Sequence, residues 1–242
     1  MHNKRTGKRD TGGKIGWLRR GFVDATYPNS LAAKARAKRN ALLIKRFPNL
    51  TEMRVVDLGG RPAYWRTFRE HPAEVVLVNL EESASQPEEE WMKIVYGDAC
   101  DPPKSIVCER FDLAFSNSTI EHVGGHRRRE DFSRTVKTLG DAYWVQTPYR
   151  YFPVEPHWMF PGFQFLPLAA KRTIGRLWPP AEINFGDGAG DLGNILQIEL
   201  LSVGELRHYF PGAVILRERF AGLTKSIIAV SGYLTEERPV RS

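Results

Sequence analysis

The sequence predicts an α/β protein with a doubly wound, mostly parallel seven-stranded sheet that finishes in an antiparallel hairpin. Between residues 54 and 147, five short apolar segments alternate with helical segments, which is typical of parallel strands buried on both faces. The segment 213–234 contains two strands joined by the turn AGLT, and strands joined so tightly are antiparallel. The composition, 42% apolar and 26% charged over 242 residues, is that of an ordinary globular protein.

The N-terminal residues 1–28 are rich in Gly, Lys, Arg and Thr, and we expect them to form a disordered basic arm. Residues 1–46 hold 13 Lys and Arg against Asp10 and Asp24, a local charge of +11. The net charge of the whole chain is +7, so the remaining residues carry −4. This asymmetry indicates either an anionic partner or a solubilising tail.

The predicted elements follow in chain order. The segment 29–50 predicts a helix with Ser30 as its N-cap and Pro48 near its end. Further helices are predicted after Tyr64 and over 128–139. The five predicted parallel strands are RVVDL (54–58), AEVVLVNL (73–80), KIVYGDA (93–99), FDLAFSN (111–117) and AYWVQT (142–147).

We expect a single domain that carries one insertion. The core strands and helices occupy 51–148, and an aromatic-rich segment, 149–200, is expected to form a cap over the substrate. The segment 201–242 returns to the core with a helix capped by Ser202, followed by the hairpin.

Polar residues and glycines follow four successive strands, at the edge where doubly wound sheets bind their ligands. Glycine lets backbone N–H groups approach a ligand, and the polar side chains can bond hydroxyl and amine groups. In strand order these residues are Asp57, Gly59 and Gly60; Asn79; Asp98 and Ala99; and Ser116, Asn117, Glu121 and His122.

With these motifs the chain resembles the class I S-adenosylmethionine-dependent methyltransferases, which have a Rossmann-like fold. The resemblance covers residues 54 to about 233 and is carried by VVDLGG, VVLVNLEE, YGDACDPP, FDLAFSNSTIEHVG and the closing hairpin. It implies a transferase that uses S-adenosylmethionine and releases S-adenosylhomocysteine.

The resemblance also implies roles for the residues at the strand ends. The loop with Asp57, Gly59 and Gly60 would pass the methionine part of the cofactor, and Asn79 would bond the ribose. Further along the edge, Asp98 and Ala99 would hold the adenine, with Ser116 and Asn117 at the fourth strand end.

Two departures from the family pattern concern these roles. Arg61 and Ala63 stand where the family has further glycines, and Asn79 stands where it has an acidic residue. A dinucleotide-binding fold is the alternative for a glycine-rich first turn, but GGRPAY lacks the G-x-G-x-x-G spacing that this fold requires.

The cap segment predicts the acceptor site. TPYRYFPVEPHWMFPGFQFLP (147–167) is dense in aromatics, which suit sugar faces and apolar rings. The run is similar to that of family members acting on small molecules and carbohydrates, so we expect a small-molecule or glycan acceptor. The expected acceptor-binding residues are Tyr149, Tyr151, Glu155 and Trp158.

Transfer of a methyl group to an aliphatic hydroxyl benefits from a general base. His157 lies in the cap and is the preferred candidate, and His122, after the fourth strand, is the alternative. The remaining histidines, His2, His71, His126 and His208, are expected at the surface.

The segment STIEHV is similar to the E-x-x-E-H motif of a metal-using quinone O-methyltransferase. Ser118 replaces the first glutamate, and Glu121 with His122 alone would hold a hard cation such as Mg²⁺ poorly. We therefore expect no metal in the reaction; a divalent ion, if used, would bind at these two residues.

Two other functions remain as alternatives: an RNA methyltransferase guided by the basic arm, and a cofactor-binding module without catalysis. The acidic body and the sequence SNST, in place of (N/D)PPY, argue against RNA as the acceptor.

No apolar run reaches the roughly 18–20 residues of a membrane span, and the N-terminus lacks a signal core. With only Cys100 and Cys108, the sequence predicts a cytoplasmic protein. The sequence does not predict an oligomeric state.

Overall fold

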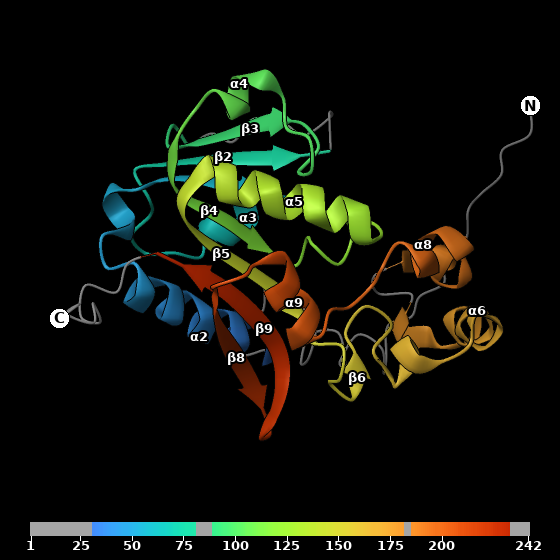
Figure 1. The fold of residues 1–242 in the computed structure, drawn as a ribbon. Helices are drawn as coiled ribbons and strands as arrows, with labels where there is room; N and C mark the ends of the chain where they lie inside the picture. The colour runs from blue at the N-terminus through green and yellow to red at the C-terminus, as the bar shows by residue number, and fades with distance from the viewer. Residues whose placement is uncertain (1–30, 81–88, 182–184, 233–242) are drawn as a thin grey trace, which may run out of the picture.

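The computed structural model describes residues 31–80, 89–181 and 185–232, and over these ranges it confirms the predicted fold class. A seven-stranded sheet has the order β3-β2-β1-β4-β5-β9-β8 (Figure 1). The first five strands are parallel, and β9 runs antiparallel to both β5 and β8. The strands are β1 (Arg54–Leu58), β2 (Glu74–Asn79), β3 (Met92–Tyr96), β4 (Phe111–Asn117), β5 (Gly140–Pro148), β8 (Val214–Phe220) and β9 (Leu223–Ser231).

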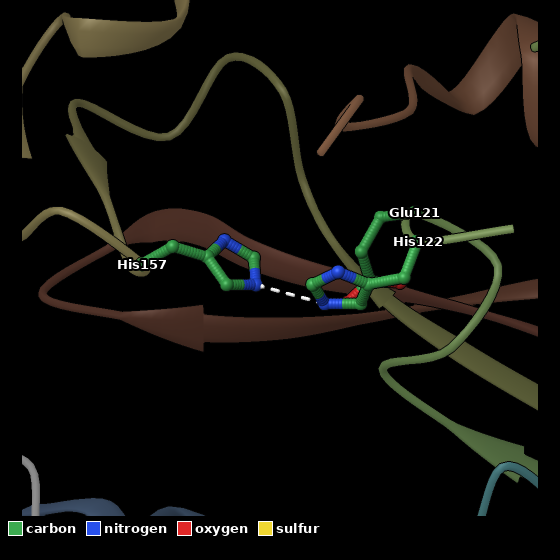
Figure 2. Close-up of side chains that lie close together, drawn as sticks. All are labelled: Glu121, His122 and His157. Carbon is green, nitrogen blue, oxygen red and sulfur yellow. Dashed lines mark hydrogen bonds between the residues drawn. The ribbon is translucent and has the colours of Figure 1, made fainter. Parts of the chain in front are cut away.

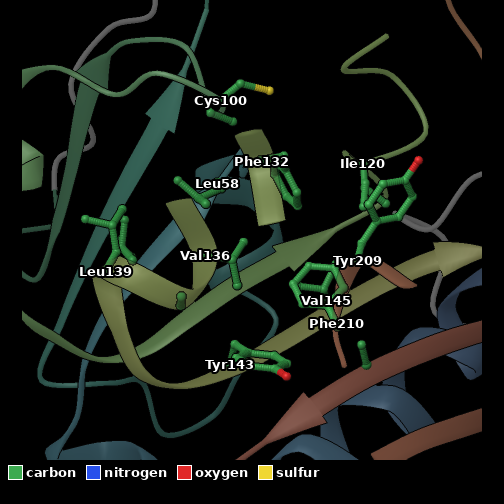
Figure 3. Close-up of a cluster of buried hydrophobic side chains, with 14 of the residues drawn as sticks. Leu58, Cys100, Ile120, Phe132, Val136, Leu139, Tyr143, Val145, Tyr209 and Phe210 are labelled. Carbon is green, nitrogen blue, oxygen red and sulfur yellow. The ribbon is translucent and has the colours of Figure 1, made fainter. Parts of the chain in front are cut away.

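Helices cover both faces of the sheet. Neighbouring strand residues point to opposite faces, and Val55 and Val56 in β1 are both fully buried in different apolar clusters. One cluster contains side chains of α4 (Lys104–Val107), α5 (His126–Leu139) and α9 (Val203–Tyr209) and is drawn in Figure 3. The other contains side chains of α2 (Leu31–Arg46) and α3 (Pro62–Trp65). This two-sided burial explains why the strands read as continuous apolar runs.

The helices differ from prediction mainly at their starts. α3 begins at Pro62, earlier than expected, because proline is well suited to the first position of a helix. This helix is a single turn. α5 begins at His126, two residues before the predicted start. The capping role of Ser202 is confirmed, since its side chain accepts a hydrogen bond from the Glu205 backbone in a capping box. The predictions for residues 1–28, Ser30 and 233–242 lie outside the described residues.

The helix α2 is part of the core. Leu43 is fully buried against the sheet, whereas the neighbouring Ile44 is 47% exposed. Arg39 on the same helix bonds both carboxylate oxygens of Glu218 in β8, at 2.9 Å each. A short 3₁₀ turn, Leu50–Glu52, then leads into β1.

We expect Leu43→Ala to lower the free energy of unfolding by about 2–5 kcal/mol, because it leaves a cavity between α2 and the sheet. The matched change Ile44→Ala removes a half-exposed side chain and should change the free energy of unfolding by no more than about 0.5 kcal/mol. Denaturant unfolding of both variants measures the difference. Equal effects would mean that α2 does not contribute to the core.

The cap folds around an apolar cluster of its own. Its elements are β6 (Val154–Glu155), β7 (Phe160–Pro161), α6 (Leu168–Leu177), α8 (Leu192–Leu196) and the 3₁₀ turns Phe163–Phe165, Pro179–Ala181 and Gly186–Gly190. Trp158 lies at the centre of this cluster, stacked on Phe163 and Phe185 with ring centroids 4.3 and 4.6 Å apart. The two ends of the cap lie side by side, because Tyr149 pairs with Leu201 and the Arg150 N–H donates to the Leu201 carbonyl.

Among the described residues, no helix combines the length and the apolar character needed to cross a membrane.

Candidate active site

A cavity of about 390 Å³ opens at the carboxyl ends of the parallel strands. Its volume falls within the range of roughly 300–1,000 Å³ that is typical of small-molecule sites. Five predicted site residues line it: Gly59, Asn79, Asp98, Ala99 and His122. The sequence analysis did not assign the other lining residues, which are Arg61, Val78, Leu80, Gly97, Ser118, Thr119, Val123 and Arg128.

The loop after β1 needs both of its glycines. Gly59 has φ +83°, a left-handed conformation, and a Cβ there would lie 2.4 Å from the Thr119 hydroxyl oxygen. A Cβ on Gly60 would lie 1.9 Å from a carboxylate oxygen of Asp57. Gly59 therefore lets the loop pack closely against Thr119, which also lines the cavity, and Gly60 leaves room for the carboxylate behind it.

Asp57 supports this loop from inside the core. Its carboxylate is buried, and one oxygen accepts a hydrogen bond of 2.8 Å from Trp65 Nε1. Burial raises the pKa of Asp57 to about 7, against the opposing effect of the Trp65 bond. The residue is not among those that line the cavity, so its predicted place beside the cofactor is one layer behind the wall.

The polar residues after β2 and β3 are held in place by neighbouring groups. The side-chain amide of Asn79 donates to the Gly60 carbonyl at 3.0 Å, which ties the second strand end to the glycine loop. Asp98 accepts two hydrogen bonds from Arg128, at 2.6 and 2.8 Å, and one from the Cys100 N–H. Arg128 comes from the start of α5, so the adenine position predicted at Asp98 is shared with a guanidinium group.

Ser116 and Asn117 lie outside the residues that line the cavity. The Ser116 hydroxyl is buried and donates to the Leu58 carbonyl at 3.0 Å. The Asn117 side-chain oxygen accepts a bond of 2.7 Å from Arg39. Both side chains thus join elements of the core at the end of β4.

The two candidate bases form a hydrogen-bonded pair, which Figure 2 shows. His122 follows β4 and His157 follows β6, and their Nε2 atoms are 3.2 Å apart. The other ring nitrogen of His157, Nδ1, is 2.6 Å from Glu155 Oε1. The second oxygen of Glu155 accepts the backbone N–H groups of His157 and Trp158 at 2.8 Å each. A buried carboxylate thus fixes the ring that contacts His122.

The two histidines have opposite pKa shifts. His122 is exposed on one side, but the protein around its ring withdraws it from water, and this desolvation, with a smaller contribution from the His157 charge, lowers the pKa of His122 to about 4. This ring is therefore neutral near pH 7. Burial also acts to lower the pKa of His157, but the hydrogen bond and charge of Glu155, with the charge of Glu121, outweigh it and raise that pKa above 6.5. The pair therefore joins a neutral imidazole to one that readily takes up a proton.

Glu121 lies beside the pair and is completely buried. One carboxylate oxygen accepts a bond of 2.9 Å from the Thr147 hydroxyl, and the other, Oε1, has no hydrogen-bond partner within the described structure. Burial raises the pKa of Glu121, against the opposing charge of His157.

The four residues predicted to bind the acceptor lie in different parts of the structure and do not form one site. Trp158 belongs to the core of the cap and donates from Nε1 to the Ala189 carbonyl. Tyr151 is exposed, Tyr149 packs against the main core, and Glu155 holds His157. A second cavity, of about 550 Å³, lies between cap and core, and of these four residues Glu155 and Trp158 line it.

Comparison with known proteins identifies the fold. No family model and no curated protein sequence matches the chain. Among solved structures, the chain is similar to the methyltransferase domain of bacterial CtHen1 (TM-score 0.52, 12% identity, covering 81% of this chain and 97% of that domain). It is also similar to the 1,6-didemethyltoxoflavin-N1-methyltransferase of Burkholderia thailandensis (TM-score 0.50, 14% identity, 81% and 76% covered). A third similar structure is DhpI in complex with SAH (TM-score 0.50, 12% identity, 89% and 93% covered). The chain has the fold of the class I S-adenosylmethionine-dependent methyltransferases.

Proposed function

We propose that the protein is an S-adenosylmethionine-dependent methyltransferase that methylates a hydroxyl group of a small-molecule or carbohydrate-like acceptor. The observation that carries this proposal is the Glu155–His157–His122 chain of hydrogen bonds at the cavity. An amine or phenolate needs little help with its proton, whereas an aliphatic hydroxyl gains from a base of this kind.

The cavity fits the cofactor by the chemistry of its lining. The cofactor supplies a sulfonium methyl group for in-line attack by the acceptor. The part of the cavity lined by Gly59 and Thr119 would admit its methionine part. Asn79 would bond the ribose hydroxyls, and Asp98 with Ala99 would face the adenine. Asp57 and Gly60 would act by shaping the loop, and Ser116 and Asn117 by fixing the end of β4.

The base would work as a relay. His122 lines the cavity and, being neutral, can accept the proton of the acceptor hydroxyl as the oxygen attacks the methyl group. It can pass a proton across the 3.2 Å contact to His157, where the negative charge of Glu155 stabilises the imidazolium. The hydrogen bonds of the Glu155 carboxylate hold this final proton acceptor in one orientation.

Asp98→Asn tests the cofactor assignment. Loss of the charged acceptor should weaken S-adenosylhomocysteine binding by about 1.5–3 kcal/mol, or about 10- to 150-fold in Kd. Calorimetric titration of the purified protein measures this change. Asp101→Asn removes the same charge three residues away, from an exposed side chain, and should leave Kd unchanged. Equal affinities for wild type and Asp98→Asn would place the adenine elsewhere.

Methyl transfer from labelled S-adenosylmethionine tests the function as a whole. The full chain is incubated separately with pools of hydroxylated small molecules and sugars, of lipid-linked acceptors, and of RNA. Label in an alkali-stable methyl ether of the first pool is the expected result. Label confined to RNA would favour a nucleic-acid methyltransferase, and binding of S-adenosylhomocysteine without transfer to any pool would favour a non-catalytic module.

A further inference from the structure

We propose that Glu121, His122 and His157 form a binding site for a divalent transition-metal ion of the Zn²⁺ class. The ligand atoms of these three side chains lie within 4.8 Å of one another. They come from two parts of the chain, since His157 belongs to the cap and the other two residues follow β4 (Figure 2).

The spacing of the two imidazoles suits a shared ion. Their Nε2 atoms are 3.2 Å apart. Zinc–nitrogen bonds of about 2.0–2.1 Å in tetrahedral geometry place two nitrogen ligands roughly 3.3 Å from each other. An ion could thus replace the proton between the rings with little movement of either side chain.

Glu121 supplies an independent indication of a ligand. It is 0% exposed, and its Oε1 has no hydrogen-bond partner within the described structure. A buried carboxylate oxygen without a partner is costly, and a bound cation would offset that cost. The carboxylate must rotate toward the rings to complete the site, since the atoms span up to 4.8 Å.

Glu155 orients the ligand that the cap provides. With Nδ1 of His157 donating to Glu155, the Nε2 atom carries the lone pair of the ring, and this lone pair could bind an ion in place of the contact with His122. This arrangement, carboxylate to histidine to metal, is the usual outer shell of a zinc-bound histidine.

The ligand set indicates the class of ion. Two imidazoles and one carboxylate, with a fourth position open, suit zinc, whereas Mg²⁺ and Ca²⁺ prefer oxygen ligands throughout. From the sequence we expect no metal, because Glu121 and His122 alone would hold Mg²⁺ poorly. With His157 they form a group of three ligands that suits a softer ion. The bound ion and the proton relay use the same Nε2 atoms, so they exclude each other, and metal binding can be tested without any turnover.

A second group on the surface must be removed for the test to be specific. His126, Glu130 and His208 also place ligand atoms within 4.8 Å of one another, and His126 and His208 are exposed. His208→Ala disrupts this group, and His208, on α9, is not among the residues that line either cavity. The experiments therefore use the full chain with His208→Ala as the reference protein.

Co²⁺ titration of the chelator-treated reference protein is expected to give one equivalent of bound ion with the visible absorption of a tetrahedral site, which Zn²⁺ then displaces. Adding His122→Gln or His157→Gln should abolish that absorption. Adding Glu155→Gln should weaken Co²⁺ binding by about 10- to 100-fold. A far-ultraviolet circular dichroism spectrum and a thermal unfolding midpoint like those of the reference protein show that the fold of each variant is intact.

Two results would overturn the site. One is a reference protein that binds no Co²⁺ at pH 7.5, and the other is tetrahedral absorption that survives loss of both His122 and His157. Failure of methyl transfer would leave these measurements untouched, so the metal site and the proposed function can fail separately.

Discussion

His157→Gln is expected to lower kcat by about 100-fold or more, because it removes the final proton acceptor of the relay while keeping a polar side chain of similar size. Turnover of the chelator-treated wild-type enzyme should rise with pH as His157 loses its proton. Glu155 and Glu121 raise the pKa of His157, so the midpoint of this rise lies above 6.5. His122 has a pKa of about 4 and stays neutral across the same range. A pH–rate profile of both proteins checks the result, and the rise should be missing from the variant.

Two companion variants sharpen this prediction. His122→Gln breaks the contact between the cavity and His157, and it should lose a similar factor in kcat. His71→Gln changes an exposed histidine that stacks on Trp91, outside both cavities, and should match wild type. Full activity in His157→Gln with an inactive His122→Gln would assign the base to His122 alone. Wild-type turnover in both would rule out histidine base catalysis.

Gly59→Ala carries the second large effect, the loss of cofactor binding. An alanine at φ +83° is strained by about 1–2 kcal/mol. Its Cβ would also collide with the Thr119 side chain, which lines the cavity. The loop or Thr119 must then shift, and both line the cavity proposed for the cofactor. We expect Kd for S-adenosylhomocysteine to rise on the order of 10-fold or more, the equivalent of about 1.4 kcal/mol.

Gly212→Ala is the matched control for this change. Gly212 has nearly the same backbone conformation, φ +80°, but a Cβ there would meet no atom within 4 Å, and the residue lines neither cavity. Gly212→Ala should lose only the stability that the backbone strain costs, whereas Gly59→Ala should lose more stability and should also lose cofactor affinity. Equal calorimetric affinities for the two variants would mean that the glycine loop does not face the cofactor.

The fold could be predicted because its signals are local. Buried parallel strands give short apolar runs, and the turn after Phe220 is a two-residue connection that only an antiparallel pair can have. The boundaries of the elements were harder to predict. No local pattern in the sequence shows that α3 is a single turn, because Trp65 at its end is held by contacts with Asp57 and the sheet.

The site could be predicted only in part, for a physical reason. The position of a strand end in the sequence predicts which residues lie at the edge of the sheet. The conformation of the loop that follows determines which of their side chains faces the cavity. Ser116 therefore bonds the Leu58 carbonyl inside the core, although Asp98 faces the cavity. Contacts between distant segments leave no pattern in the sequence at all. Arg128 meets Asp98 across 30 residues, and His157 meets His122 across 35.

The pairing of Tyr149 with Leu201 has a consequence for how such a protein can diversify. The two ends of this insertion lie side by side, so that a longer insertion leaves the sheet unchanged, and each doubling of its length adds only about 0.6 kcal/mol of chain-closure cost. The residues between these ends also form their own apolar cluster around Trp158. Under the proposed function, exchanging this one module would change the acceptor preference while the cofactor edge of the sheet stays the same. His157 and Glu155 belong to that module, whereas His122 belongs to the segment that follows β4. A cap transferred to another protein of this fold would supply the Glu155 and His157 part of the proposed relay, and the recipient protein would have to supply the residue at the position of His122.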